Sequence, residues 1–283
     1  MKDASKLIAG PYKHEFGHEL FSFQATVRAL AKNYEEVVVC SNPQMKFLYE
    51  DFCTEFVSYN DPNVDLAALS KGSDCEIFSQ KDCMKNVRKF RGTSRARQEF
   101  IKYGRVVSEG YDLLLHCRTK SEGMSTDLSI KTWNCVYETL KEEYKIAFVG
   151  TKSQAHCPNG AKDLRGIELS DLTDIMRSSK LVAGYSSGPI HLASLCGAPH
   201  LTWGGHRLRT LFRYAHFWNP FKTPCYIFES PSENPGYLQR RACLWGAPPD
   251  IFDRKYVTLI KDKNYRVPTV NNLLCAIRKI LNG

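Results

Sequence analysis

The stretch YSSGPIHLASLCGAP, residues 185–199, carries the clearest chemistry in this sequence. Its proline suits the first turn of a helix, so the Ser-Ser-Gly turn is expected to lead from a strand into a helix N-terminus. Such a terminus offers unbonded N–H groups and the positive end of the helix dipole, and the glycine lets an anion approach the backbone. The pattern predicts a phosphate-binding turn, and the alternative is a capped core helix with a structural histidine. The candidate residues are Ser186, Ser187, Gly188, Pro189 and His191.

A second group of reactive side chains lies in GPYKHEFGHELFSFQ, residues 10–24. Carboxylates and imidazoles can move protons, and a partly desolvated carboxylate with a raised pKa can act as a general base. The alternative is that these acids only favour a helix N-terminus through its dipole. The candidate catalytic residues are Glu15, Glu19 and His18, with His14 beside them.

Both groups lie in segments where strands and helices alternate. An apolar run that ends in Gly-Pro, residues 6–11, predicts a first strand, and apolar residues at helical spacing follow over 17–34. Further strands are expected at 35–41 and 55–59, with a helix over 43–52 between them. The order strand-helix-strand-helix-strand predicts a parallel sheet.

The same alternation starts again after residue 110. Strands are expected at 111–118, 145–150, 180–185 and 199–205, and helices at 130–144, 169–179 and 188–197, the last closed by Gly197. Two successive α/β patterns indicate two Rossmann-like domains, at 1–107 and 108–265. The amphipathic segment 266–283 is expected to form a C-terminal helix that packs toward the N-terminal domain. Residues 206–265 remain unassigned.

The bulk composition narrows the class of protein. The chain has 283 residues, 43% of them hydrophobic, and a net charge of +9, which fits a globular protein with anionic ligands or simply a basic surface. No secretory signal or membrane-spanning run is visible. Its eleven cysteines are scattered without a Cys-x-x-Cys pair, which argues against a disulfide framework and a zinc site. These features predict a reducing, cytoplasmic location.

The strand–Ser-Ser-Gly-Pro-x-His–helix–Gly-x-Pro–strand pattern resembles the heptosyltransferase-type glycosyltransferases, over roughly residues 111–205. In that family an Asp-Thr-Gly-Pro-Met-His motif binds the donor diphosphate, and this chain has Ser186 where the family has Asp. The resemblance implies a GT-B architecture, in which two Rossmann-like domains with parallel sheets face a central cleft. It also implies inversion at the transferred sugar and a catalytic Asp after a Gly in the first turn of the N-terminal domain. Counting back from the helix makes Glu19 the nearest match to that Asp, whereas position in the loop favours Glu15.

The resemblance adds further donor-site candidates. By analogy, Arg118, Lys120 and Lys131 face the diphosphate, and the alternative for each is a solvent-facing basic loop. Thr151 and Lys152 follow a strand where the family places groups near the nucleoside. Arg207, in the basic aromatic segment after residue 205, either lies near phosphate or packs between the domains, as does Arg209.

Together these features predict an inverting, metal-independent glycosyltransferase. The donor is a nucleotide-diphosphate sugar, with UDP favoured over GDP or ADP, and the acceptor is a hydroxyl of a glycan. No Asp-x-Asp occurs in the chain, so neither a metal nor another cofactor is expected. One alternative is a non-catalytic nucleotide- or phosphate-binding module. Another is a basic RNA-binding protein that uses residues 83–105, although no RNA-binding motif accompanies this run. Peripheral membrane contact is left open.

Overall fold

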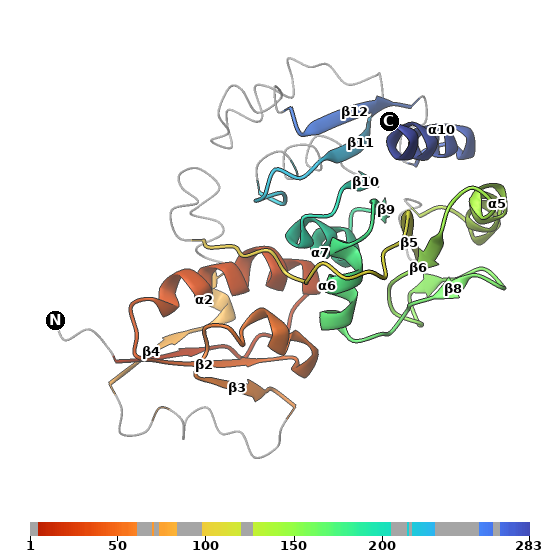
Figure 1. The fold of residues 1–283 in the computed structure, drawn as a ribbon. Coiled ribbons are helices and arrows are strands. Elements are labelled where there is room, and N and C mark those ends of the chain that lie inside the picture. Colours follow the sequence, from red (N-terminus) through yellow and green to blue (C-terminus); the bar gives the residue numbers. More distant parts are fainter. Residues whose placement is uncertain are drawn as a thin grey trace. The chain divides into compact units, whose positions relative to one another are not determined.

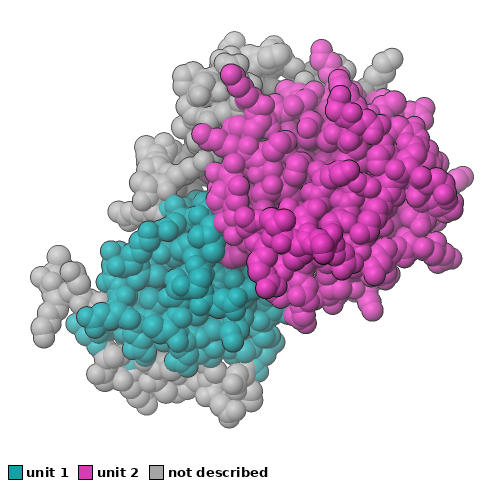
Figure 2. Space-filling view, viewed as in Figure 1, with its two compact units in different colours: residues 1–101 teal, residues 102–283 magenta. Residues whose placement is uncertain are grey.

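The computed structural model describes residues 5–60, 70, 74–83, 98–119, 127–204, 214, 217–229, 255–262 and 267–283. The chain forms two compact units, Met1–Ile101 (unit 1) and Lys102–Gly283 (unit 2), which Figure 2 shows in teal and magenta. The division lies slightly before the boundary at 107/108 that the sequence suggested. Most of the basic segment 83–105 lies outside the described residues.

Unit 1 is built on a four-stranded parallel sheet in the order β3-β2-β1-β4. The apolar runs of the two inner strands, β1 and β2, are buried, as is usual for parallel sheets, whereas the edge strands β3 and β4 are partly exposed. The sequence predicted the first three strands, whereas the fourth lies in a segment that had no assignment. The strands are β1 (Lys6–Ala9), β2 (Glu36–Ser41), β3 (Glu55–Ser58) and β4 (Cys75–Phe78).

The helix predicted over residues 17–34 has three parts. It begins as α1 (Phe16–His18), widens into a π-helical turn (Glu19–Phe23) and continues as α2 (Gln24–Ala31). All five residues of the π-helical turn are buried. The helix expected over 43–52 is a 3-10 helix, Pro43–Leu48. Helical spacing therefore located both segments but did not distinguish the type of helix.

Unit 2 contains a larger sheet in the order β12-β11-β10-β9-β5-β6-β8, in which every neighbouring pair is parallel. A short strand, β7, pairs antiparallel with β5. Strands β11 and β12 lie in the segment that the sequence left unassigned. The strands are β5 (Leu113–Arg118), β6 (Ile146–Phe148), β7 (Ala155–His156), β8 (Lys162–Asp163), β9 (Leu181–Tyr185), β10 (His200–Trp203), β11 (Cys225–Glu229) and β12 (Val257–Lys261).

Among the described residues, four helices cover the sheet of unit 2: α5 (Ile130–Leu140), α6 (Leu169–Arg177), α7 (Gly188–Cys196) and α10 (Val270–Asn282). Figure 1 shows α5 and α10 on one side of the strands and α6 and α7 on the other. Trp133 of α5 and Leu273 of α10 belong to one buried apolar core with alternate residues of β5. The C-terminal helix was expected to pack toward the N-terminal domain, but these contacts place α10 in the core of unit 2.

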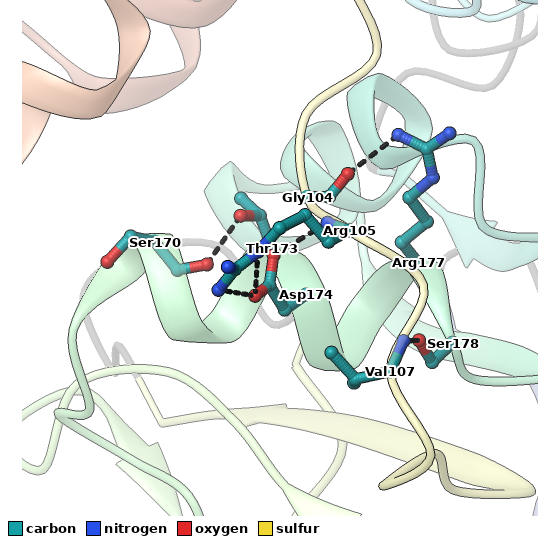
Figure 3. A network of polar contacts seen from close by, with 8 residues as sticks. All are labelled: Gly104, Arg105, Val107, Ser170, Thr173, Asp174, Arg177 and Ser178. Carbon is teal, nitrogen blue, oxygen red and sulfur yellow. Dashed lines mark hydrogen bonds and ion pairs between the residues drawn. The ribbon is translucent and has the colours of Figure 1, made fainter. Parts of the chain in front are cut away.

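A polar network fixes the first residues of unit 2 on α6 (Figure 3). The Arg105 guanidinium donates to Asp174 Oδ2 at 2.7 and 3.0 Å, and its backbone N–H donates to Asp174 Oδ1. Arg177 Nη1 donates to the Gly104 carbonyl oxygen, and the N–H of Val107 donates to Ser178 Oγ at 2.8 Å. The segment that precedes β5 is therefore part of unit 2.

Within the described residues, no helix combines the length and the apolar character needed to cross a bilayer.

Candidate functional site

The order of strands in unit 2 marks one place on its sheet for ligand binding. The chain passes from β5 to β6 on one side, and the later strands β9 and β10 lie on the other side of β5. The carboxyl ends of β5 and β9 therefore flank the point where the chain reverses direction across the sheet. Open parallel sheets bind ligands outside such a point. The Ser186-Ser187-Gly188 turn follows β9 directly, so it lies at this position.

Helix α7 begins at this turn with an open N-terminus. Ser187 is the N-cap residue in an extended conformation, and Pro189 occupies the first turn. A serine at this position normally accepts a hydrogen bond from the second or third helical N–H, which stabilises a helix by about 1 kcal/mol. Within the described residues, the Ser187 side chain makes no such bond. The N–H groups of Gly188 and Ile190 thus remain available at the positive end of the helix dipole.

The Ser187 hydroxyl is bound on the sheet side of the turn instead. Its Oγ lies 2.8 Å from the carbonyl oxygen of Tyr185, to which it donates, and 2.9 Å from His116 Nδ1. A hydroxyl has one proton, so donation to Tyr185 requires that Ser187 Oγ accepts from a protonated His116 Nδ1. Ser187 was a candidate for anion binding, but in this structure its hydroxyl proton is bonded to the strand.

His116 is a functional candidate that the sequence analysis did not identify. It lies on β5 opposite Gly184 of β9 and is only 5% exposed. Burial, followed by the nearby charge of Arg118, lowers the pKa of His116 to about 4, so the imidazole is neutral at physiological pH. The one signal in the sequence was a histidine inside an apolar strand, next to its carboxyl end.

Ser186 and His191 are joined through a residue distant in sequence. The Tyr214 hydroxyl lies 3.3 Å from Ser186 Oγ and 3.2 Å from His191 Nδ1. The His191 ring also packs on Trp218, at 4.2 Å between ring centroids, and is 6% exposed. His191 was a candidate for anion binding, but the structure buries its ring. It supports the turn through Tyr214, and the rings of Tyr214 and Trp218 pack against it.

The basic candidates occupy different surroundings. Arg118 Nε donates to Asp127 Oδ1 at 2.7 Å, and the guanidinium carbon lies 3.8 Å from the centroid of the Tyr185 ring. Its charge is therefore partly balanced at the edge of the candidate site. Lys131 is exposed on the first turn of α5, and Thr151 and Lys152 are exposed after β6. Lys120 and Arg207 lie outside the described residues, as does Arg209.

The acidic turn of unit 1 occupies the corresponding place on its own sheet. Strand β1 lies between β2 and β4, so the carboxyl ends of β1 and β4 flank the point of reversal. The N–H of Gly10 donates to the Phe78 carbonyl at 3.0 Å, and the N–H of Tyr12 donates to the Cys40 carbonyl at 3.0 Å. The turn that leads to Glu15 is thus anchored on both neighbours of β1.

The three catalytic candidates in this turn differ in exposure. Glu15 and His18 are exposed, and the Glu15 carbonyl accepts the N–H of His18 at 3.0 Å. Glu19 is 3% exposed and its Oε1 accepts hydrogen bonds from the Ser41 and Tyr49 hydroxyls, the latter at 2.8 Å. Burial raises the pKa of Glu19 to about 7, although these two hydrogen bonds oppose the shift. A group that removes a proton from a substrate must reach it, so this geometry favours Glu15 or His18 over Glu19.

No group of three or more His, Cys, Asp or Glu side chains that could hold a metal ion is found among the described residues. The cysteines of the described residues are free thiols, with Cys40, Cys117 and Cys225 among the buried ones.

Comparison with solved structures places this fold among glycosyltransferases. The chain is similar to the glycosyl transferase family 9 protein from Veillonella parvula, with a TM-score of 0.61 and 12% identity over 100% of this chain and 98% of the other. It is also similar to ADP-heptose LPS heptosyltransferase II of E. coli, with a TM-score of 0.54 and 11% identity over 98% of both chains. The iron-containing dodecameric glycosyltransferase TibC of E. coli matches 72% of this chain and 59% of its own length, with a TM-score of 0.51 and 15% identity.

No protein-family model matches the sequence, and no curated protein matches it significantly. The structural similarity confirms the fold class that the sequence predicted, the GT-B type of family 9 glycosyltransferases. Because the sequence identities are only 11–15%, the structural similarity shows the fold alone.

Proposed function

We propose that this protein is a glycosyltransferase that takes a sugar from a nucleotide-diphosphate donor and transfers it to a hydroxyl of a glycan. The observation that carries the proposal is the open N-terminus of α7 at the point of chain reversal in unit 2. Its free N–H groups, at Gly188 and Ile190, and its helix dipole suit a diphosphate. The likeness to family 9 glycosyltransferases supports this choice among the anions that such a site could bind.

In the proposed reaction, the acceptor oxygen attacks the anomeric carbon while the bond from that carbon to the diphosphate oxygen breaks. The acceptor proton passes to a base, and the departing diphosphate keeps the electron pair. The N–H groups at the start of α7 stabilise its negative charge, as preorganised donors do at other developing anions. A single displacement of this kind inverts the anomeric centre.

We assign the base to the exposed side chains of the unit 1 turn, with Glu15 as the first choice and His18 as the second. The backbone of Glu15 is held at the start of the helix because its carbonyl accepts the N–H groups of His18 and Glu19, at 3.0 and 3.2 Å. Glu19 has the role of a positioning residue, because its carboxyl group is bonded to Ser41 and Tyr49.

The nucleoside and the need for a metal are open to direct test. The sequence favoured UDP, whereas the E. coli neighbour takes its name from ADP-heptose. The chemistry proposed here uses only groups of this chain, and metal independence is part of the proposal. The TibC neighbour is described as iron-containing, so the test is made with and without a chelator.

The test is a thermal-shift panel of UDP, GDP and ADP, each beside its monophosphate, and of CMP, together with their sugars. A ligand that binds only the folded state at 100 times its Kd stabilises by about 2.7 kcal/mol. We expect one nucleoside diphosphate to raise Tm more than its monophosphate. If none does, the proposal fails. If one does but no sugar is transferred from it, the protein is a nucleotide-binding module.

A further inference from the structure

The first turn of α7 contains a conflict between helix stability and ligand binding. Ser187 is a favoured N-cap residue, and Pro189 has no N–H, so the usual partner left for its hydroxyl is the N–H of Ile190. That same N–H belongs to the proposed diphosphate site. A serine that capped the helix in the ordinary way would therefore compete with the ligand.

The structure shows how this competition is avoided. The Ser187 hydroxyl donates to the Tyr185 carbonyl at 2.8 Å and receives the Nδ1 proton of His116 at 2.9 Å. Both partners belong to strands at the point of chain reversal, so the hydroxyl is directed toward the sheet and away from the helix. His116 supplies the bond that an unassisted serine would lack there.

The surroundings of His116 fix its ring in this orientation. Gly150 has φ +126°, and a Cβ at that position would lie 2.9 Å from His116 Cδ2 and 3.1 Å from its Nε2. A side chain there would displace the imidazole. Among the described residues His116 Nε2 has no hydrogen-bond partner, so the bond to Ser187 alone selects the tautomer.

We propose that His116 is a positioning residue of the donor site, which holds the Ser187 hydroxyl on the sheet and so keeps the first N–H groups of α7 free for the diphosphate. This role rests on the proposed function, because it assumes that the diphosphate binds at α7. It predicts that His116 affects donor affinity only through Ser187.

The test is a double-mutant cycle measured by calorimetric titration with the nucleoside diphosphate that the thermal-shift panel selects. His116→Phe fills the same space without a donor, so Ser187 turns to the Ile190 N–H and must be displaced by the ligand. An N-cap hydrogen bond stabilises a helix by about 1 kcal/mol, and the ligand must overcome it. The Kd of the nucleoside diphosphate should therefore rise about fivefold, while Tm stays level or rises. His116→Asn places an amide N–H near the position of Nδ1 and should restore Kd to within about twofold of the original.

The control background is Ser187→Ala, which has no hydroxyl to compete. Here His116→Phe should leave Kd unchanged. An equal loss of affinity in the original and in the Ser187→Ala background would overturn the proposal, because His116 would then act independently of the serine. Equal affinity of the original protein and His116→Phe would overturn it as well. If the original protein binds no nucleotide of the panel, the proposed function itself fails, and this role fails with it.

A second measurement does not depend on substitution. Nitrogen-15 spectra of the histidine side chains, assigned with His116→Asn, should show His116 neutral at pH 7 with its proton on Nδ1. A proton on Nε2 would reverse the bond to Ser187 and would overturn the proposal even if the Phe variant does not fold.

Discussion

The turn after β1 in unit 1 and the turn after β9 in unit 2 lie at equivalent places on two parallel sheets, yet they direct their polar groups differently. After β1, the carboxyl group of Glu19 points into the core and is bonded to two hydroxyls. After β9, the side chain of Ser187 is bonded to the sheet and the first N–H groups of α7 have no cap from it. The same sheet position has thus produced a turn with an exposed carboxylate, Glu15, and a turn with uncapped N–H groups.

These two arrangements suit different steps of the proposed reaction. An anion is stabilised by the open helix N-terminus of α7, whereas the exposed Glu15 would repel it. A proton can be accepted by Glu15, whereas an N–H group cannot accept one. We therefore expect changes in the unit 1 turn to affect the rate of transfer and changes in the unit 2 turn to affect donor affinity.

The largest effect is expected for Glu15→Gln. Loss of a general base typically lowers a rate by about 10²- to 10⁴-fold, and the exposed Gln should leave donor binding unchanged. The measurement is kcat for release of the nucleoside diphosphate in the presence of acceptor, together with the Kd of the donor product. Glu55→Gln is the matched control, because Glu55 is also exposed in unit 1 but begins β3.

Two outcomes would change this assignment. Full activity of Glu15→Gln together with loss in His18→Gln would transfer the role of base to His18. A loss of donor affinity in Glu15→Gln equal to the loss of rate would remove the proposed division between the two turns.

The next largest effect concerns the stability of unit 1. The pKa of Glu19 is about 7 in the folded state against an ordinary value of 4.5, so between these values the folded protein binds more protons than the unfolded chain. Stability therefore falls as pH rises through this window, by about 3 kcal/mol at most. Glu19→Gln has no charge to bury, so its free energy of unfolding should depend less on pH. It should therefore be the more stable protein at pH 8.

Urea unfolding at several pH values between 4.5 and 8.5 measures this difference, with Glu55→Gln again as the control. If the free energy of unfolding changes with pH equally in Glu19→Gln and in the original protein, the buried carboxyl group does not govern this pH dependence. A loss of stability in Glu19→Gln at every pH would show that the bonds from Ser41 and Tyr49 need the carboxyl group in either protonation state.

A smaller effect is expected from a negative charge placed at the start of α7. Ser187→Asp puts a carboxylate where the diphosphate is proposed to bind, so the Kd of the nucleoside diphosphate should rise about tenfold, or 1.4 kcal/mol. Asp is favoured at helix N-termini, but a carboxylate cannot donate to the Tyr185 carbonyl as Ser187 does, so Tm is measured beside Kd. The matched control is Ser129→Asp on α5, where the serine already caps its helix through the N–H of Thr132. If both substitutions change Kd equally, α7 is not the anion site.

Much of the architecture follows from local sequence patterns. The apolar run Val37–Cys40 is buried in β2 as predicted, and Pro189 and Gly197 bound α7, with Gly197 in the left-handed conformation at φ 74°. By contrast β4, β11 and β12 were not predicted. These strands lie at or near the edges of the sheets, and their pairing depends on neighbours that are distant in sequence.

The candidate site was predicted only in outline. The Ser-Ser-Gly-Pro turn was identified because its chemistry is local. By contrast, His116 reaches Ser187 from 71 residues away, and Tyr214 reaches Ser186 from 28 residues away. A π-helical turn at Glu19 could not be foreseen, since its apolar spacing resembles that of an α-helix. Which of the clustered acids is exposed was therefore open.

Local sequence was enough to locate the residues that can bind an anion or move a proton, because turn formation and helix initiation depend on neighbouring residues. How each of these groups is used depends on contacts between distant parts of the chain. It buried Glu19 under Ser41 and Tyr49 and left Glu15 exposed. It also bonded Ser187 to His116 instead of to its own helix. Burial and hydrogen bonding between strands distant in sequence set charge state and orientation, and a linear pattern contains neither.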